Sequence, residues 1–550
     1  MHGFCVTRAS ASRDRRARTA IIAAVVAALA LPSAAAAAPK RVIVKQATAK
    51  CAALAGVEVK ESQIELRTQG ALVVTATLTA PDAASGGPEF CLVRGHVRGH
   101  DPDAPPINFQ VNLPTSWNKK SVQFGGGGFN GVLVTGLGVG PGAAPATNAP
   151  EPAINRGYVT FGSDGGTAVG TRPAGSFGLN DEALANYAGE SVKRTRDAVM
   201  ALVKRYYRKR PVLEYHVGGS KGGHEGLVAA QRYAKDYDGI IAYYPANQNQ
   251  AMVMTWYHLW QQAYGRPGGY LNPAKQQLVV KAVYAACDGL DGATDGMVAN
   301  LAACDATFDV DTLRCPDGAD TGDTCLSDTQ IGTLDAAATP FQFAFPLAYG
   351  VTTLGKFPIY QGADPAGTWL ESTGTGASGY NGFAQPVIRY FILQQPEAST
   401  AGFDYRNYEA RVKGLSWQLD ATDPDIDRYA KRGGKLILVQ GTLDMLVPHS
   451  TTTQYYERLA ARYGMKVRDF VRYFIAPGYA HGNGPFNVSW DSLTALERWR
   501  EHGVAPADQV AFDGNAATKD RSRPLCEYPA WPKYVAGDVD EASSFTYAVT

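Results

Sequence analysis

The sequence predicts an α/β fold in which a large insert divides a mostly parallel sheet. Segments typical of strands alternate with segments typical of helices between residues 157 and 234, and the alternation resumes between 435 and 501. Hydrophobic residues make up 45% of the 550 residues, which is enough for a sizeable core. The alternating segments are 157–162, 182–207, 212–217 and 223–234, and then 435–440, 451–463, 469–475 and 489–501.

The first 38 residues have the order of a signal peptide. Arginines between Arg13 and Arg18 precede an apolar run from Ala20 to Leu31, and small residues follow up to Ala38. This order predicts export with cleavage near residue 38. The apolar run is shorter than the roughly 20 residues that a membrane span needs. We therefore expect a secreted or periplasmic protein with no membrane partner in its mature form.

Three segments before residue 120 alternate apolar and polar side chains, which predicts an antiparallel, β-rich N-terminal extension. These segments are 71–80, 91–98 and 107–113. The α/β alternation stops near Pro245, and the region after it holds two cysteine pairs and an aromatic cluster. We therefore predict a catalytic domain made of 39–246 and 431–550, with a lid domain at 247–430.

The charge balance argues against one class of partner. Lys and Arg number 52 and Asp and Glu number 51, so the formal net charge is +1. Such a chain has no bulk positive field that would attract nucleic acid or an anionic membrane. We expect a small-molecule substrate and no nucleic-acid partner.

The most specific functional signal is a serine between a predicted strand and a predicted helix. Strand 212–217 runs into Gly218–Gly223, and the helix follows at once. The pattern Gly-x-Ser-x-Gly in this position is typical of the nucleophile elbow of α/β-hydrolases, a sharp turn that exposes the serine, here Ser220. Small residues at Gly218 and Gly222 let the strand and helix backbones approach each other. The alternative is an ordinary glycine-rich turn.

A serine hydroxyl is a weak nucleophile, so the elbow requires a histidine base and an orienting carboxylate later in the chain. Asp444 follows strand 435–440 and His481 follows strand 469–475, so both lie at the carboxyl edge of the predicted sheet. We predict these two residues as the acid and the base. The competing residues precede the strand or lie at a predicted helix start: Asp423, Asp425, Asp427 and His449.

A glycine run supplies a candidate oxyanion hole. Residues 123–131 follow a short strand and contain four consecutive glycines, like the HGGG-type loop of esterases. We predict the backbone of Gly127 as one donor and the amide of Lys221 as the other. A phosphate-binding loop does not fit, because no Lys-Ser/Thr pair closes the run. A plain flexible loop is the alternative.

Seven cysteines remain after the predicted signal peptide. In an exported protein they predict disulfides, and no CxxC or HExxH pattern supports a redox or metalloprotease site. If each cysteine pairs with its neighbour in the sequence, Cys526 has no disulfide partner, although the sequence permits other connectivities. The neighbouring pairs are Cys51 with Cys91, Cys287 with Cys304, and Cys315 with Cys325.

Together these motifs resemble the tannase and feruloyl esterase family of α/β-hydrolases, from about Cys51 to the end of the chain. The resemblance implies a lid between the strands that carry Ser220 and Asp444, and it implies the three local disulfides. It also implies a secreted serine esterase for aromatic acids of feruloyl, galloyl or terephthalate-monoester type, without an organic cofactor. The segments that carry the likeness, besides the elbow, are Trp117-Asn118, Ala230–Tyr233, Asp238–Ile240, Cys287–Gly292, Gly441–Asp444, Pro477–His481, Arg523–Cys526 and Tyr528-Pro529.

Four positions depart from the family pattern. Gly219 and Gly482 stand where similar proteins carry a disulfide beneath the nucleophile and the base, and Lys221 replaces the usual threonine. Cys526 matches a family cysteine whose late partner is missing from this sequence. The sequence retains the nucleophile, acid and base in spite of these departures. They nevertheless weaken any assignment of one particular substrate.

A second constellation lies in the insert. Asp288, Asp291 and Asp295 occupy a glycine-containing segment that ends at Met297. Hard oxygen ligands on a tight loop suit calcium, although Asp-Gly repeats taken alone are more typical of turns. The family resemblance implies a structural calcium ion bound by the three aspartates and the carbonyls of Ala293 and Met297. Because the segment lies far along the insert from the elbow, we expect no direct part in catalysis.

Aromatic side chains of the insert supply candidate substrate contacts. Trp256, Tyr257 and Trp260 are placed to stack on an aromatic acyl group from the lid side, although an aromatic core beneath the lid is an equally good interpretation of each one. Two other functions stay open. One is an esterase, lipase or peptidase of different specificity, and the other is a catalytically altered homologue that mainly binds.

Overall fold

Thirteen strands of the described residues form one mixed sheet. The computed structural model describes residues 47–82, 86–138, 150–518 and 520–549, so the predicted signal peptide lies outside it. In spatial order the strands are β1 (Glu58–Val59), β2 (Ala71–Thr79), β3 (Phe90–Val97), β4 (Ile107–Pro114), β6 (Val159–Ser163), β5 (Lys120–Phe124), β7 (Leu213–Gly219), β8 (Gly239–Tyr243), β11 (Lys435–Gly441), β12 (Val471–Ala476), β15 (Ser522–Glu527), β14 (Gln509–Asp513) and β13 (Val488–Ser489).

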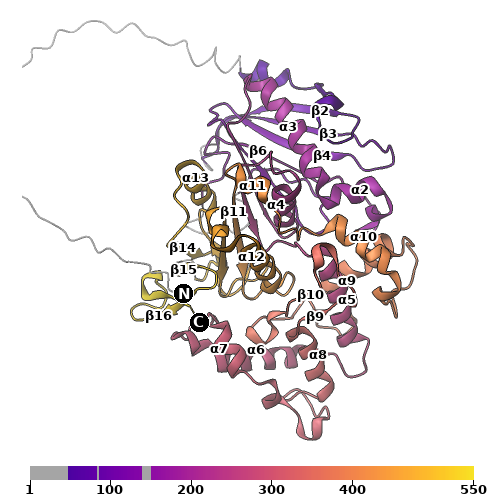
Figure 1. Ribbon diagram of the computed structural model, residues 1–550, viewed down its shortest axis with the longest axis vertical. Helices are drawn as coiled ribbons and strands as arrows, with labels where there is room; N and C mark the ends of the chain where they lie inside the picture. Colours follow the sequence, from indigo (N-terminus) through magenta and orange to yellow (C-terminus); the bar gives the residue numbers. More distant parts are fainter. Residues whose placement is uncertain (1–46, 83–85, 139–149, 519, 550) are drawn as a thin grey trace, which may run out of the picture. The chain divides into compact units, whose positions relative to one another are not determined.

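The middle of this sheet is parallel, as predicted. The run β6–β5–β7–β8–β11–β12 is joined by parallel ladders, and β7 and β11 lie on either side of β8. The elbow strand and the acid strand are therefore close in space although about 220 residues separate them in the chain. Figure 1 shows these strands between the labelled helices α4, α12 and α13.

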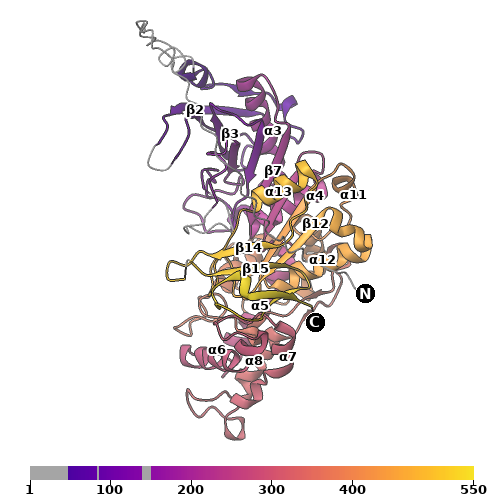
Figure 2. The ribbon, with the colours of Figure 1, turned by 90° about the vertical axis from the view of Figure 1, so that its left-hand side faces the viewer.

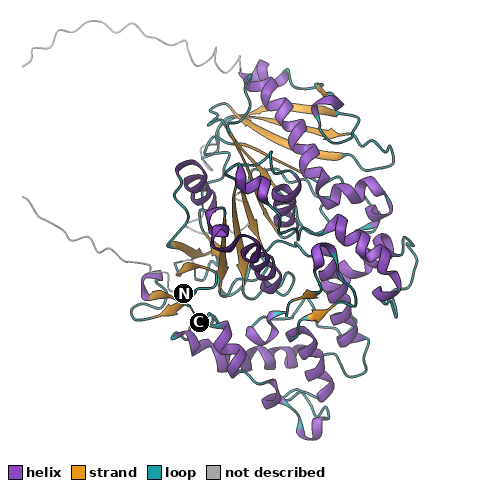
Figure 3. Ribbon diagram, in the orientation of Figure 1, coloured by secondary structure: helices purple, strands orange, loops and turns teal. Residues whose placement is uncertain are grey.

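Helices cover both faces of the parallel strands, which explains why these strands are apolar throughout. Ile240 and Leu438 pack with α4 and α12, whereas Ile241 and Val439 pack with α13 on the opposite face. All four side chains are fully buried. The flanking helices are α3 (Ser191–Tyr207), α4 (Lys221–Arg232), α12 (His449–Tyr463) and α13 (Ser492–His502), drawn purple around the orange strands in Figure 3.

Both ends of the sheet are antiparallel. At the N-terminal end β2, β3 and β4 pair in sequence order, which confirms the predicted β-rich extension. At the other end β15 pairs with β12 on one side and with β14 on the other. Figure 2 shows β14 and β15 side by side. We did not predict β13, β14 or β15, because their short segments lack an alternating apolar pattern and Pro524 interrupts β15.

The predicted helix 182–207 is two helices. A short α2 (Asp181–Ala185) and α3 are separated by a π-helical segment at Asn186–Glu190, within which Gly189 has a φ of +123°. A Cβ atom at Gly189 would lie 2.6 Å from Val228 of α4, so the glycine permits a close approach that a side chain would block. The tight packing against α4 therefore breaks the helix that the periodicity predicts.

The segment between β8 and β11 contains further helices and carries its own apolar cluster, in which Trp369, Tyr380 and Phe391 are fully buried. Leu443 and Met445, from the loop after β11, join the same cluster. Its helices are α5 (Asn249–Tyr264), α6 (Pro273–Cys287), α7 (Leu301–Thr307), α8 (Asp328–Ala338), α9 (Gly379–Pro386), α10 (Glu409–Leu419) and α11 (Asp427–Lys431).

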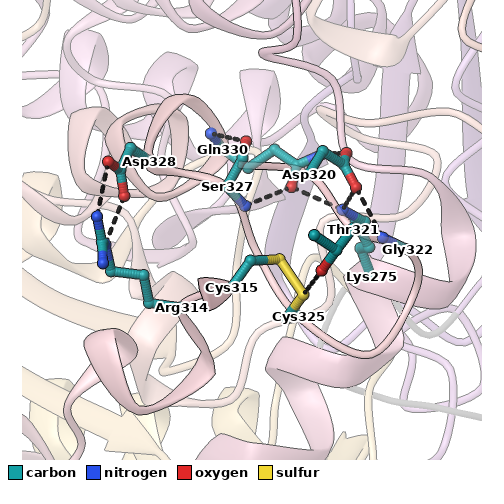
Figure 4. The surroundings of a disulfide bond; sticks show 10 residues. All are labelled: Lys275, Arg314, Cys315, Asp320, Thr321, Gly322, Cys325, Ser327, Asp328 and Gln330. Carbon is teal, nitrogen blue, oxygen red and sulfur yellow. Dashed lines mark hydrogen bonds and ion pairs between the residues drawn. A yellow bond between two sulfur atoms is a disulfide. The ribbon is translucent and has the colours of Figure 1, made fainter. Parts of the chain in front are cut away.

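The three neighbouring cysteine pairs form disulfides, which confirms the pairing. Figure 4 shows the pair Cys315–Cys325 beside the Arg314–Asp328 ion pair and the Lys275–Asp320 ion pair. Cys526 is a free, buried cysteine, and burial raises the pKa of its thiol to about 12. Among the described residues we find no helix with the length and apolar character that a membrane crossing requires.

Candidate active site

Ser220 occupies a strained turn between β7 and α4. Its φ of 55° and ψ of −118° lie outside the regions that non-glycine residues favour. The turn is held by two backbone hydrogen bonds, in which the Ser220 amide donates to the Tyr243 carbonyl (3.0 Å) and the His224 amide donates to the Ser220 carbonyl (3.0 Å). A Cβ atom at Gly218 would lie 2.3 Å from the backbone of Gly222, so the turn requires glycine there. This geometry matches the nucleophile elbow that the sequence predicts.

The structure brings the predicted acid and base together. Asp444 Oδ2 lies 2.7 Å from His481 Nδ1. The other carboxylate oxygen, Oδ1, accepts hydrogen bonds from the amides of Leu446 and Val447, each at 2.8 Å. Asp444 is fully buried and the His481 side chain is 24% exposed. The carboxylate is therefore fixed in place, and it can orient the histidine ring so that Nε2 is free for proton transfer.

The pairing follows from the sheet. Asp444 leaves β11 and His481 leaves β12, and these strands are parallel neighbours whose carboxyl ends lie at the same edge. The Leu443 amide donates to the Tyr479 carbonyl (2.9 Å), which ties the two loops together. The ring of Tyr244, just beyond β8, packs against the His481 ring at a centroid distance of 4.6 Å. His449 is half-buried at the start of α12 and contacts Gln361 (2.9 Å), as expected for a residue outside the site.

Ser220 and His481 line two cavities that share one lining residue. The Ser220 cavity has a volume of about 30 Å³ and is mainly apolar. The His481 cavity has a volume of about 540 Å³ and includes polar groups such as Asp364, Thr368 and Asn483. Leu446, two residues after Asp444, lines both cavities. The residues around the smaller cavity are Gly128, Phe129, Tyr187, Ser220, Lys221, Ala246, Asn249, Met252, Val253, Trp256, Phe383, Val387, Leu446 and Val447.

The glycine run packs directly against the elbow. The Gly222 amide donates to the Gly126 carbonyl (2.9 Å), and the Gly126 amide donates to Glu225 Oε2 (3.1 Å). A Cβ atom at Gly125 would lie 2.5 Å from the Cα of Gly222, so this contact needs glycine on both sides. Within the run it is Gly128 that lines the Ser220 cavity. The predicted donor Gly127 precedes it.

Lys221 is buried beside the nucleophile, which the sequence alone did not suggest. Its side chain is 2% exposed, and its Nζ lies 2.9 Å from His224 Nδ1 and 4.0 Å from the centre of the Tyr187 ring. His224 Nε2 lies 2.6 Å from the Leu419 carbonyl, so Nδ1 is left to accept from the lysine. Burial lowers the pKa of Lys221 to about 7, and the Glu225 carboxylate opposes this shift.

Only one of the three predicted aromatic contacts reaches the Ser220 cavity. Trp256 lines it, whereas Tyr257 lines a separate cavity of about 620 Å³ whose walls include neither Ser220 nor His481. Trp260 donates to the Gly376 carbonyl (2.9 Å) and stacks on Tyr257. All three residues lie on α5, but a helix turns 100° and rises 1.5 Å per residue. Tyr257 therefore faces another direction, and Trp260 lies about 6 Å further along the axis.

The aspartates of the predicted calcium segment bond mainly to their own loop. Asp288 accepts the Met297 amide (3.1 Å), Asp291 accepts the Ala293 amide (3.0 Å), and Asp295 forms an ion pair with Arg523. Burial, aided by the charges of Asp295 and Asp288, raises the pKa of Asp291 to about 6. Within the described part of the chain, no three His, Cys, Asp or Glu side chains are grouped as they would be around a metal ion. A bound ion would have to draw these carboxylates away from backbone amides.

This segment is closer to the site than its position in the sequence suggests. Met297 packs so tightly on Gly478 that a Cβ atom there would lie 2.8 Å from the Met297 side chain. Gly478 belongs to the loop that carries His481, and Gly296 lines the His481 cavity. The loop therefore folds back onto the edge of the sheet next to the His481 loop, and the expectation that it takes no direct part in catalysis stays a prediction.

The mixed sheet, the elbow and the paired acid and histidine define an α/β-hydrolase. Residues 91–548 match the model of the family described as tannase and feruloyl esterase, and the chain belongs to this family. It is 36% identical to an uncharacterized esterase of Agrobacterium fabrum, over 92% of this chain and 94% of the relative. It is 31% identical to the mono(2-hydroxyethyl) terephthalate hydrolase of Piscinibacter sakaiensis, over 85% of this chain and 87% of the relative.

The solved structures support the same fold. Feruloyl esterase B from Aspergillus oryzae superposes with a TM-score of 0.74 at 20% identity, and the match covers 91% of this chain and 100% of that one. At this identity the likeness concerns the fold alone.

Proposed function

We propose that this protein is a secreted or periplasmic serine esterase that hydrolyses carboxylic esters of aromatic acids. The observation that carries the proposal is the strained Ser220 at the edge of the sheet where Asp444 pairs with His481, with Leu446 lining both the Ser220 cavity and the His481 cavity. Membership of the tannase and feruloyl esterase family supports an ester substrate with an aromatic acid. The signal-like N-terminus and the three disulfides support export.

In the proposed reaction, Ser220 Oγ attacks the ester carbonyl and His481 Nε2 takes the hydroxyl proton. Asp444 holds Nδ1 of the ring and stabilises the imidazolium that forms. The imidazolium then protonates the departing alcohol, which leaves an acyl-enzyme on Ser220. Water, activated by the same histidine, attacks this ester and releases the acid.

The oxyanion of each tetrahedral intermediate requires backbone donors. The amide of Lys221 at the first position of α4 is one candidate, and the helix N-terminus adds a favourable dipole. The second donor comes from the glycine run, where Gly127 is the predicted residue and Gly128 is the one that lines the cavity. Glu225 fixes the run through its bonds to the Gly126 amide and to Asn130.

The two cavities suggest how a substrate divides between them. Aromatic side chains such as Phe129, Trp256 and Phe383 surround the space beside Ser220, and they would stack on an acyl ring once they move apart to admit it. The larger and more polar cavity beside His481 suits the alcohol, because the histidine must protonate the leaving group. Trp256 is the proposed contact from the predicted set, and its ring packs against those of Tyr380 and Phe383.

We further propose that calcium binds the Asp288–Met297 loop as a structural ion. Three carboxylates and the Ala293 and Met297 carbonyls form a donor set of hard oxygens. The disulfide between Cys287 and Cys304 brackets this loop and limits its freedom. Calcium would have to draw the three carboxylates together, and it would neutralise their charge.

Activity-based labelling tests the proposal. A fluorophosphonate probe should modify the purified protein at Ser220, as located by mass spectrometry of the labelled peptide, and Ser220→Ala should remain unlabelled. Feruloyl, galloyl, terephthalate-monoester and short p-nitrophenyl esters should then identify the acyl group that is turned over best. An unlabelled wild-type protein that hydrolyses none of these esters would favour the alternative of a binding homologue.

A further inference from the structure

Asn249 lines the Ser220 cavity and carries a buried hydrogen-bond acceptor that has no partner within the described part of the chain. The residue is 8% exposed and lines this cavity together with Ser220. Its Oδ1 is buried and has no hydrogen-bond partner among the described residues. A buried acceptor without a partner costs about 1–3 kcal/mol. Such a group calls for an explanation, and a ligand that supplies the missing donor is one.

A short chain of hydrogen bonds fixes the orientation of the Asn249 amide. The Tyr187 hydroxyl donates to the Gly128 carbonyl (3.3 Å), so its oxygen is left to accept. Asn249 Nδ2 donates to that oxygen over 3.4 Å. If the nitrogen and oxygen of the amide were exchanged, Oδ1 would face the Tyr187 hydroxyl oxygen, whose proton is already donated to the Gly128 carbonyl. The amide nitrogen therefore serves Tyr187, and Oδ1 is the atom left without a partner.

The backbone around Asn249 is tied to the nucleophile. Asn249 is the first residue of α5, and the Ala246 amide three residues earlier donates to the Ser220 carbonyl (3.1 Å). The backbone amide of the next residue, Gln250, donates a hydrogen bond to Asp420 Oδ1 (2.7 Å). These bonds hold the start of α5 at a set position relative to the elbow. The acceptor is therefore part of a built site.

The remaining wall of the cavity is mostly apolar, with Phe129, Trp256 and Phe383 as its largest side chains. The cavity volume of about 30 Å³ is room for about one water molecule. An aromatic ring is larger, so it enters only when these side chains move apart. A flat apolar ligand with one hydrogen-bond donor at its edge matches such a wall. A hydroxylated aromatic ring has this chemistry.

We propose that Asn249 is a specificity-determining residue whose side-chain oxygen accepts a hydrogen bond from a ring hydroxyl of the acyl group. The inference rests on the proposed esterase function and adds the residue that would recognise a ring hydroxyl. A site that hydrogen-bonds a substrate hydroxyl rejects the analogue that lacks it, because the buried oxygen is then left unpaired. A ring that carries only acceptors at its edge would meet the same penalty.

Matched ester pairs test this inference. We would measure kcat/KM of the wild type for methyl esters of 4-hydroxycinnamate and cinnamate, and of 3- and 4-hydroxybenzoate and benzoate. At least one hydroxylated ester should be preferred by about tenfold or more. In Asn249→Leu that preference should fall to near one, because kcat/KM for the hydroxylated ester drops about 10- to 100-fold. A general folding defect would lower both members of a pair equally.

Two further variants make the test specific. Gln250→Met removes a buried, unpartnered amide from the next position of α5, which does not line the cavity, and it should keep the wild-type preference. Asn249→Asp keeps an acceptor at a helix N-terminus that favours negative charge, and it should retain part of the preference.

Equal turnover of both members of every pair by the wild type would mean that Oδ1 only binds water, and the inference would fail. The same holds if Asn249→Leu keeps the preference. If neither these esters nor p-nitrophenyl acetate are hydrolysed, the esterase proposal itself fails.

Discussion

Ser220 combines a strained backbone with a single hydroxyl, and only the hydroxyl should be needed for chemistry. Ser220→Ala should retain the fold and lose nearly all ester turnover, keeping less than about a hundredth of the wild-type rate. Initial rates on a p-nitrophenyl ester, together with thermal melting, measure both effects. Ser121→Ala is a matched control, because Ser121 is a buried serine on β5 whose hydroxyl also lacks a partner. Activity above that level in Ser220→Ala would contradict the assignment of the nucleophile.

Lys221 should make stability depend on pH. Because its pKa in the folded state is about 7 instead of 10.5, the unfolded chain binds more protons than the folded protein between these values. The free energy of unfolding of the wild type therefore rises with pH across that window. Below about pH 7 the buried Lys221 ammonium destabilises the folded protein to its full extent. Lys221→Met removes this cost, so its free energy of unfolding should exceed that of the wild type by a few kcal/mol below pH 7.

Urea unfolding of Lys221→Met and wild type at several pH values measures the difference, which should shrink as the pH approaches 10.5. The exposed Lys204 on α3 provides the control, and Lys204→Met should show no pH-dependent gain. A Lys221→Met protein that is less stable than wild type at every pH would contradict the expectation. In that case the hydrogen bond to His224 and the contact with Tyr187 would outweigh the cost of burial.

At the scale of elements, the loop Asp288–Met297 links the insert to the edge of the sheet. Chelation should lower the melting temperature by several degrees, since an ion that binds only the folded state stabilises it by mass action. The initial rate measured well below the transition should change less, because the proposed ion is not in the reaction path. Differential scanning calorimetry with and without excess chelator measures the shift.

Variants of the same loop separate calcium from other effects of the chelator. Asp291→Asn should melt at a lower temperature that the chelator no longer changes. Asp317→Asn alters an exposed aspartate outside the loop and should keep the full response to the chelator. An unchanged melting temperature in excess chelator, with no metal found by elemental analysis, would rule out the calcium proposal.

The whole molecule determines the acyl specificity, because the walls of the Ser220 cavity come from distant parts of the chain. Phe129 follows the glycine run, Tyr187 lies before α3, and Phe383 lies on α9 of the insert. We expect aromatic acyl esters to be hydrolysed with a higher kcat/KM than long aliphatic ones, since the small cavity is surrounded by rings. Comparison of hydroxycinnamate and benzoate esters with long-chain p-nitrophenyl esters tests this, and a preference for the long chains would overturn it.

The sequence by itself determined the α/β core and the order of Ser220, Asp444 and His481. Each of these signals is local: a strand, a turn with small residues, and then a helix or a loop. The same kind of local pattern predicted the antiparallel β2–β4 region. The disulfides joined neighbours along the chain, which made the simplest pairing correct. The short strand β15, with its proline, carried no such signal.

Only the tertiary structure decided which other residues share the Ser220 cavity. Asn249 and Tyr187 carry no motif, and their contact depends on how α5 and the segment before α3 pack around the elbow. The same packing buries Lys221, and it separates Trp256 from Tyr257 although they are neighbours in sequence. It also folds Met297 onto the His481 loop. Convergence of distant side chains depends on long-range packing, which a local sequence pattern does not encode.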